Sequence, residues 1–131
     1  MSREIELYEV VEHPDFTKQE KRLVRKKKFV QLPNQIDDLI TELQEGRFSG
    51  TLMERSDMPV PHEIYKKRLP NLDTNEGKSN GYRIVYLVEY SGKYIAFLTI
   101  YYKKEQADAS DAYIRGLADG VLLHLTSPDD A

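Results

Sequence analysis

Two neighbouring runs of β-branched and aromatic residues constrain the fold of this chain most strongly. They are Tyr82–Tyr90 and Lys93–Tyr102, and the short Ser91-Gly92 segment between them is typical of a β-hairpin turn. The second run contains YIAFLTIYY and is apolar on both faces, which predicts a central strand covered on both sides. A shorter strand is predicted at Ile64–Leu69, because Pro70 cannot donate a hydrogen bond to a sheet and ends it.

The residues before this sheet predict one more strand and two helices. Ile5–Val11 alternates as a strand does, and a helix is expected over Asp15–Lys28. A second helix is predicted to start with Asn34 as its N-cap and to end at Gly46. Asp37-Asp38 would then lie in its first turn, where the helix dipole favours negative charge. Its core-facing stripe consists of Ile36, Leu39, Ile40 and Leu43.

The remaining segments complete a single domain over residues 1–131. Phe48–Pro61 is expected to be a connecting loop, in which Pro59 and Pro61 enforce extended backbone. Ser110 is predicted to cap a final helix. The apolar stripe of that helix contains Ile114, Leu117, Ala118, Val121 and Leu122. The predicted fold class is therefore α+β, in the order strand, helix, helix, strand, strand, strand, helix, with a small antiparallel-rich sheet packed on the helices.

Composition excludes several kinds of protein. No apolar run has transmembrane length and the N-terminus is charged from Arg3 onward, so a cytoplasmic protein without a membrane partner is expected. The absence of cysteine rules out disulfides and thiol catalysis. His13, His62 and His124 lack metal-ligand spacing, so no metal or other cofactor is expected.

The sequence GKS at Gly77–Ser79 resembles part of a phosphate-binding loop but lacks the rest of that motif. The motif needs a glycine five positions earlier, where this chain has Leu72, and a helix after it, where this chain has a predicted strand. We interpret the segment as an exposed turn that can present Lys78 to a phosphate.

Charge is segregated along the chain. Residues 62–104 contain eight lysines and arginines and four acidic residues, a net of +4, although the whole chain is at −3. Because the cations recur on neighbouring strands, they can converge on one face that suits a polyanion such as RNA. The alternative is a solvated sheet edge that lysines protect. The basic run RLVRKKK at residues 22–28 has the same two interpretations, phosphate contact or a solvated helix face. The nine tyrosines can pack the sheet or stack on bases.

Three strings, KKRLPN, GKSNGYRIVYLVE and AFLTIYYKKEQADAS, closely resemble the RelE/HigB superfamily of bacterial toxins from type II toxin–antitoxin modules. The resemblance covers Ile64–Tyr113 most strongly and implies a RelE-like fold. It also implies a small endoribonuclease that cuts mRNA, typically in the ribosomal A site, and that a cognate antitoxin protein neutralises. In such enzymes the ribose 2′-OH attacks its own 3′ phosphate, which leaves a 2′,3′-cyclic phosphate and a 5′-OH.

The resemblance and the charge pattern together assign roles to eight residues. The catalytic positions are Lys66, Arg83, Lys104 and Tyr113, and the RNA-binding positions are Arg68, Lys78, Lys103 and Tyr102. Tyr113 matches the family tyrosine only with three residues inserted before it, and Tyr102 is the nearer alternative. Arg83 is expected to share a strand face with Val85 and Leu87, which would hold its guanidinium for a phosphate.

The chain also departs from the family pattern. Ile64 stands where some members carry a second strand lysine, and Asn80 stands where glycine is common. The His/Asp set of HigB-type members is not evident. A second hypothesis therefore stays open, in which the chain is a non-catalytic protein of the same fold that binds RNA, the ribosome or a protein partner.

Overall fold

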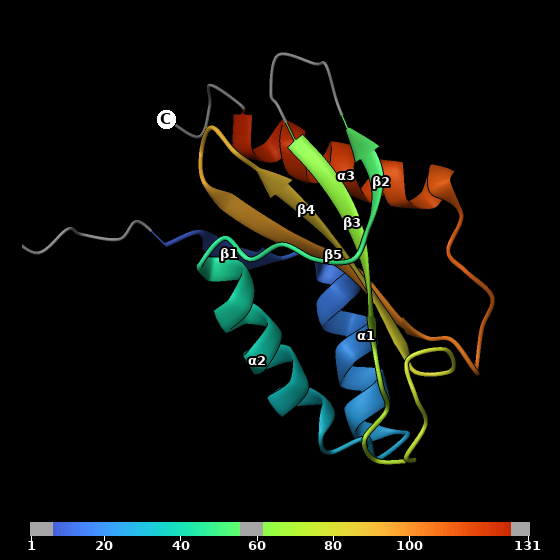
Figure 1. The fold of residues 1–131 in the computed structure, drawn as a ribbon. Helices are drawn as coiled ribbons and strands as arrows, with labels where there is room; N and C mark the ends of the chain where they lie inside the picture. The colour runs from blue at the N-terminus through green and yellow to red at the C-terminus, as the bar shows by residue number, and fades with distance from the viewer. Residues whose placement is uncertain (1–6, 56–61, 127–131) are drawn as a thin grey trace, which may run out of the picture.

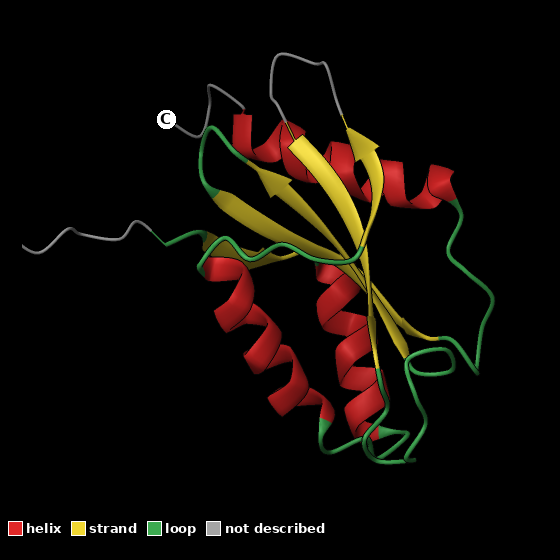
Figure 2. Cartoon of the chain, viewed as in Figure 1, coloured by secondary structure: helices red, strands yellow, loops and turns green. Residues whose placement is uncertain are grey.

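The computed structural model describes residues 7–55 and 62–126, which form a five-stranded mixed sheet and three helices (Figures 1 and 2). The elements are β1 (Glu9–Glu12), α1 (Pro14–Arg25), α2 (Leu32–Gln44), β2 (Thr51–Arg55), β3 (His62–Leu69), β4 (Tyr82–Glu89), β5 (Tyr94–Tyr102) and α3 (Asp111–Thr126). The strand order is β1-β5-β4-β3-β2, with β1 parallel to β5 and the other pairs antiparallel. The predicted α+β class is confirmed.

Helices cover both faces of the sheet (Figure 1). One face packs against α1 and α2 around Phe16, Leu23 and Leu39, and the other packs against α3 around Ile114 and Ala118. Every residue of β5 is buried, as predicted for a central strand, and every residue of β4 is buried as well. Within β4, side chains alternate between the two cores. Tyr82, Ile84, Tyr86 and Val88 belong to the α1–α2 core, while Val85 and Leu87 belong to the α3 core.

The start of α2 differs from the prediction. The helix begins at Leu32 and not after Asn34, so Asp37 and Asp38 lie beyond its first turn. Pro33 fits this start, because proline is tolerated in the first turn of a helix. The capping carboxylate comes from far along the chain, since an Asp73 oxygen accepts a hydrogen bond from the Gln31 backbone N–H at 3.1 Å. Local sequence gives no sign of such a cap. The predicted end is confirmed, with Gly46 at φ 83° two residues after the helix.

The prediction of a loop over residues 48–61 is wrong in part, because Thr51–Arg55 forms strand β2 on the outer edge of β3. Pairing with β3 stabilises this strand through backbone hydrogen bonds, which the local sequence does not predict. The prediction of extended backbone at Pro59 and Pro61 concerns residues outside those that the structure describes. Gly50 precedes β2 at φ 110°, and a Cβ there would lie 2.5 Å from the Lys66 carbonyl oxygen.

Two other boundaries shift. The first strand is Glu9–Glu12, later than predicted, and Ile5 lies outside the described residues. Helix α1 ends at Arg25, and the left-handed Lys28 (φ 63°) turns the chain toward α2. Helix α3 starts where expected, because the Ser110 hydroxyl accepts a hydrogen bond from the Tyr113 N–H at 3.1 Å. None of the helices in residues 7–55 and 62–126 is long and apolar enough to cross a membrane.

Candidate nucleic-acid interface

The α3 face of the sheet carries a group of basic and phenolic side chains at the end where β3 and β5 finish. Arg68 of β3 pairs directly with Arg83 of β4, which pairs with Tyr101 of β5. Directly paired residues point to the same face, so these three lie in one row. Lys66 lies one row away, opposite Val85 of the α3 core. We call Lys66, Arg68, Arg83, Tyr101 and Lys103 the basic face.

The fifth member, Lys103, follows β5 and continues its pairing. Its backbone N–H donates to the Gly81 carbonyl at 2.8 Å, just before β4 starts. A Cβ at Gly81 would lie 2.1 Å from the Leu69 carbonyl oxygen, so only glycine fits where β3, β4 and β5 converge. From here the 103–110 segment runs along the side of the molecule to α3 (Figure 1).

Arg83 is more deeply engaged than the sequence predicts. Its residue exposure is only 5 %, and its predicted sharing of a face with Val85 and Leu87 is confirmed by the alternation of β4. Nη1 donates to the Lys78 carbonyl at 2.8 Å and to the Tyr82 carbonyl at 3.3 Å, and Nη2 donates to the Ser79 carbonyl at 3.0 Å. The guanidinium therefore fastens the 77–80 turn to the start of β4.

A carboxylate stands among the cations of the basic face. Asp108 Oδ1 accepts a hydrogen bond from the Tyr101 hydroxyl at 3.0 Å and lies 3.2 Å from Lys103 Nζ and 3.9 Å from Lys66 Nζ. The hydrogen bond from Lys103, helped by that from Tyr101, lowers the pKa of Asp108. Burial raises the pKa of Tyr101 to about 12, so its hydroxyl remains a neutral donor. Sequence reasoning missed both residues. The two-residue spacing between Tyr101 and Lys103 could have placed Tyr101 on this face, but nothing local marks Asp108.

Tyr102 and Lys104 are directed elsewhere. Tyr102 is buried in the α1–α2 core beside Phe29, with 5.2 Å between ring centroids, and its hydroxyl donates to Glu76. Lys104 Nζ lies 3.1 Å from Glu76 Oε2. A hydrogen bond from Thr74 and the contact with Lys104 lower the pKa of Glu76. Glu76 thus ties the loop after β3 to the end of β5, and the structure does not bring Tyr102 or Lys104 into the basic face.

Tyr113 also lies apart from the cations. Its hydroxyl donates to Asp15, and this hydrogen bond raises the pKa of Tyr113 to about 12. The other Asp15 oxygen accepts from the Thr99 hydroxyl at 2.6 Å. Among the described residues, no hydrogen bond or ion pair joins Tyr113 to the basic face. The contact instead connects α3 to the start of α1.

Lys78 faces a different surface, a cavity of about 260 Å³ between α2 and the last residues of β3, which lie beyond its pairing with β2. Cations there meet acidic side chains of α2, and the charged lining consists of Asp38, Glu42, Lys67, Arg68 and Lys78. Arg68 therefore borders both this cavity and the basic face. The opposing charges make the cavity a weaker anion site than the basic face.

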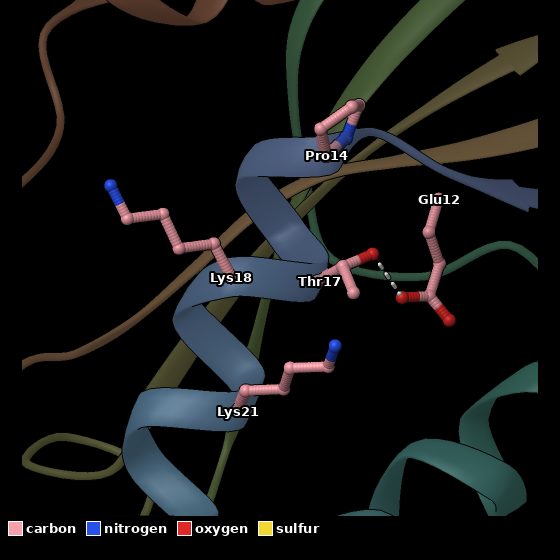
Figure 3. A pocket seen from close by; sticks show the side chains of 5 residues that line it. All are labelled: Glu12, Pro14, Thr17, Lys18 and Lys21. Atoms are coloured by element: carbon pink, nitrogen blue, oxygen red, sulfur yellow. Dashed lines mark hydrogen bonds between the residues drawn. The ribbon is translucent and has the colours of Figure 1, made fainter.

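Two side chains of the basic run at residues 22–28 are engaged in ion pairs within the protein. Arg22 Nη2 and Lys27 Nζ lie 2.5 Å and 2.9 Å from the two oxygens of Glu105, which anchors the segment after β5. A larger cavity of about 570 Å³ opens beside the start of α1 and is lined by Glu12, Pro14, Thr17, Lys18 and Lys21. Thr17 donates a hydrogen bond to Glu12 at 2.9 Å, and Lys21 extends to the same side of α1 while Lys18 points away from it (Figure 3). None of the residues that line this cavity belongs to the basic face.

The histidines give no catalytic or metal centre in the part of the chain that the structure describes. His13 Nδ1 accepts a hydrogen bond from the Asp15 N–H at 2.9 Å and so caps α1. His62 is buried at the far end of β3, opposite Glu89, and the His124 side chain lies outside the described residues. No group of three or more possible metal ligands is found over the same residues.

Comparison with models of known protein families, and with proteins of curated function, finds no match to this chain.

Proposed function

We propose that the chain is the toxin of a type II toxin–antitoxin system, an mRNA endoribonuclease of the RelE/HigB type that acts on translating ribosomes in the cytoplasm. The observation that carries the proposal is the convergence of Lys66 and Lys103 on one acceptor oxygen, with Arg68 on the same face. Two ammonium groups that reach one anionic oxygen can reach one phosphoryl oxygen. The strand and helix order follows the one expected for a RelE-like fold except for the additional strand β2.

The reaction that the proposal requires needs cations more than it needs a metal or a nucleophilic side chain. The 2′ oxygen forms a bond to phosphorus while the bond from phosphorus to the 5′ oxygen breaks. A base takes the 2′-OH proton and an acid supplies one to the leaving 5′ oxygen. The transition state carries additional negative charge on the phosphoryl oxygens, which the preplaced ammonium groups of Lys66 and Lys103 stabilise.

The structure changes the roles proposed for the other sequence candidates. Arg83 acts by holding the 77–80 turn, because its guanidinium is bound to carbonyl groups. Lys104 and Tyr113 are bound to Glu76 and Asp15 and would need those contacts to open before they reach a substrate. An antitoxin with an acidic segment would cover the basic face and block RNA.

A second function has its own supporting observation. The described part of the basic face contains no histidine, and its arginine at position 83 is occupied, so an acid and a base are not evident among its side chains. A protein that binds RNA or the ribosome without cutting would need only the cations. Cleavage separates the two functions.

Induced expression in bacteria, followed by growth measurement and primer extension on cellular mRNA, tests the proposal. The wild-type chain should arrest growth and create new 5′ ends within translated regions, in register with codons. The Lys66→Gln/Lys103→Gln variant should do neither. Lys18→Gln/Lys21→Gln is the matched control, since it removes the same charge from the surface of α1. Growth arrest without new mRNA ends would favour the non-catalytic function, and harmless expression of the folded wild type would refute the toxin.

A further inference from the structure

Asp108 is an acidic residue in contact with three members of the basic face, and these three donors, from two strands, surround a single oxygen of it. Tyr101 comes from β5, Lys66 from β3 and Lys103 from the end of β5, and all three approach Oδ1. The residue exposure of Tyr101 is 2 %, whereas the side chain of Asp108 is 54 % exposed. The site thus consists of a buried phenol and two ammonium groups, and its acceptor is a carboxylate that remains largely exposed to solvent.

The donors of this site suit a phosphoryl oxygen as well as they suit a carboxylate. Both acceptors are anionic oxygens, and charge-assisted hydrogen bonds to them have the same geometry. Tyr101 donates as a neutral phenol at neutral pH, and burial raises its pKa further, to about 12, so it does not repel an anion. Asp108 is ionised there, since the Lys103 hydrogen bond lowers its pKa.

The position of Asp108 allows it to leave. It lies in the 103–110 segment, whose ends are fixed by the Glu105 ion pairs with α1 and by the Ser110 cap of α3. More than half of the side chain already faces solvent, so rotation away from the donors uncovers little buried surface. Partly exposed ion pairs of this kind contribute little to stability, and an incoming phosphate anion can replace them.

We propose that Lys66, Tyr101 and Lys103 bind one phosphodiester oxygen of the RNA, and that Asp108 occupies this site in the free protein and is displaced when RNA binds. This inference rests on the proposed function for the identity of its ligand. It assigns Tyr101 to the RNA site and gives Asp108 the role of an internal competitor. Removal of the Asp108 charge should therefore strengthen phosphate binding specifically through these three donors.

Titration with inorganic phosphate, followed by ¹H–¹⁵N NMR of the whole chain, measures this competition without RNA. Asp108→Asn should bind phosphate about five- to tenfold more tightly than wild type, since it frees two ion pairs and a hydrogen bond. Asp111→Asn is the matched control, because it makes the same change of charge three residues away and has no described contact with the three donors. Its gain should stay below about twofold, as expected for a screened surface charge.

Two further arms decide whether the gain belongs to this site. Adding Tyr101→Phe and Lys103→Gln to Asp108→Asn should abolish it. A 2′-deoxy dinucleotide, whose single phosphodiester cannot be cut, should reproduce the order of affinities seen with inorganic phosphate. Equal gains for Asp108→Asn and Asp111→Asn would overturn the inference, as would a gain that survives loss of the two donors. A gain with inorganic phosphate alone would overturn the assignment to RNA.

The two proposals fail in different ways. Phosphate binding that follows the expected order in a protein that cuts no mRNA would refute the endoribonuclease and leave the anion site standing. Cleavage of mRNA by a protein in which Asp108→Asn gains nothing would refute only the role of Asp108.

Discussion

Replacing Arg83 by alanine should destabilise the domain strongly, because its guanidinium binds the 77–80 turn to the start of β4. The change removes hydrogen bonds to the carbonyls of Lys78, Ser79 and Tyr82. Hydrogen bonds to charged groups contribute about 1.5–3 kcal/mol each. The two shorter hydrogen bonds, to Lys78 and Ser79, therefore predict a loss of unfolding free energy of roughly 3–6 kcal/mol. Water can rebind the carbonyls of the exposed turn, so we expect the lower end, about 3 kcal/mol.

The assay is equilibrium unfolding by heat and by urea. A loss of about 3 kcal/mol in a domain of this size lowers the melting temperature by roughly 10–15 °C. Arg83→Lys should recover only part of this, because an ammonium group cannot reach carbonyls on both sides as the planar fork does. Arg68→Ala is the matched control, since it removes the same charge from the directly paired position, which is exposed. It should change stability by no more than about 0.5 kcal/mol.

Equal melting temperatures for Arg83→Ala and wild type would refute the reasoning. The guanidinium would then be available for a phosphate, as the sequence alone suggests. A much lower melting temperature together with wild-type cleavage by the fraction that remains folded would place Arg83 in the turn and not at the phosphate.

Two other predictions concern the frame around the basic face. Gly81→Ala should cost about 3 kcal/mol or more, because its Cβ would overlap the Leu69 carbonyl; Gly77→Ala, which meets no atom within 4 Å, should melt within a few degrees of wild type. The Arg22 hydrogen bond, with help from Lys27, lowers the pKa of Glu105, so its contribution to stability is present above its ordinary pKa of 4.5 and is lost as the pH falls through the lower folded value. The difference in unfolding free energy between wild type and Glu105→Gln should therefore shrink as the pH falls below about 4.5, and a difference independent of pH would contradict the ion pairs.

Periodicity predicted the interior of the sheet well. The run that forms β5 could only be buried, because YIAFLTIYY has no polar face to present to water. The apolar stripes of α2 and α3 also predicted which residues are buried. Leu39 and Ile114 lie in the two cores, as their spacing requires. Such elements can be predicted from local sequence, since the spacing of their apolar side chains shows which face is buried.

Long-range contacts could not be predicted from local sequence. Thr51–Arg55 is a strand because β3 offers it an edge, and the cap of α2 comes from Asp73, 42 residues from its partner Gln31. The candidate site has the same limit. Alternation placed Lys66 and Arg68 on one face, but the entry of Asp108 depends on the path of the segment after β5. Lys104 was expected among the cations, and Glu76 draws it to the opposite side.

Single-turnover cleavage of mRNA on programmed ribosomes tests the central claim most directly, that the basic face cuts RNA. The wild-type protein should produce fragments ending in a 2′,3′-cyclic phosphate, and Lys66→Gln/Lys103→Gln should slow cleavage by on the order of a hundredfold or more while its melting temperature stays near that of wild type. Lys18→Gln/Lys21→Gln should cut at the wild-type rate. A folded wild-type protein that cuts no mRNA, or equal rates for the two double variants, would contradict the account.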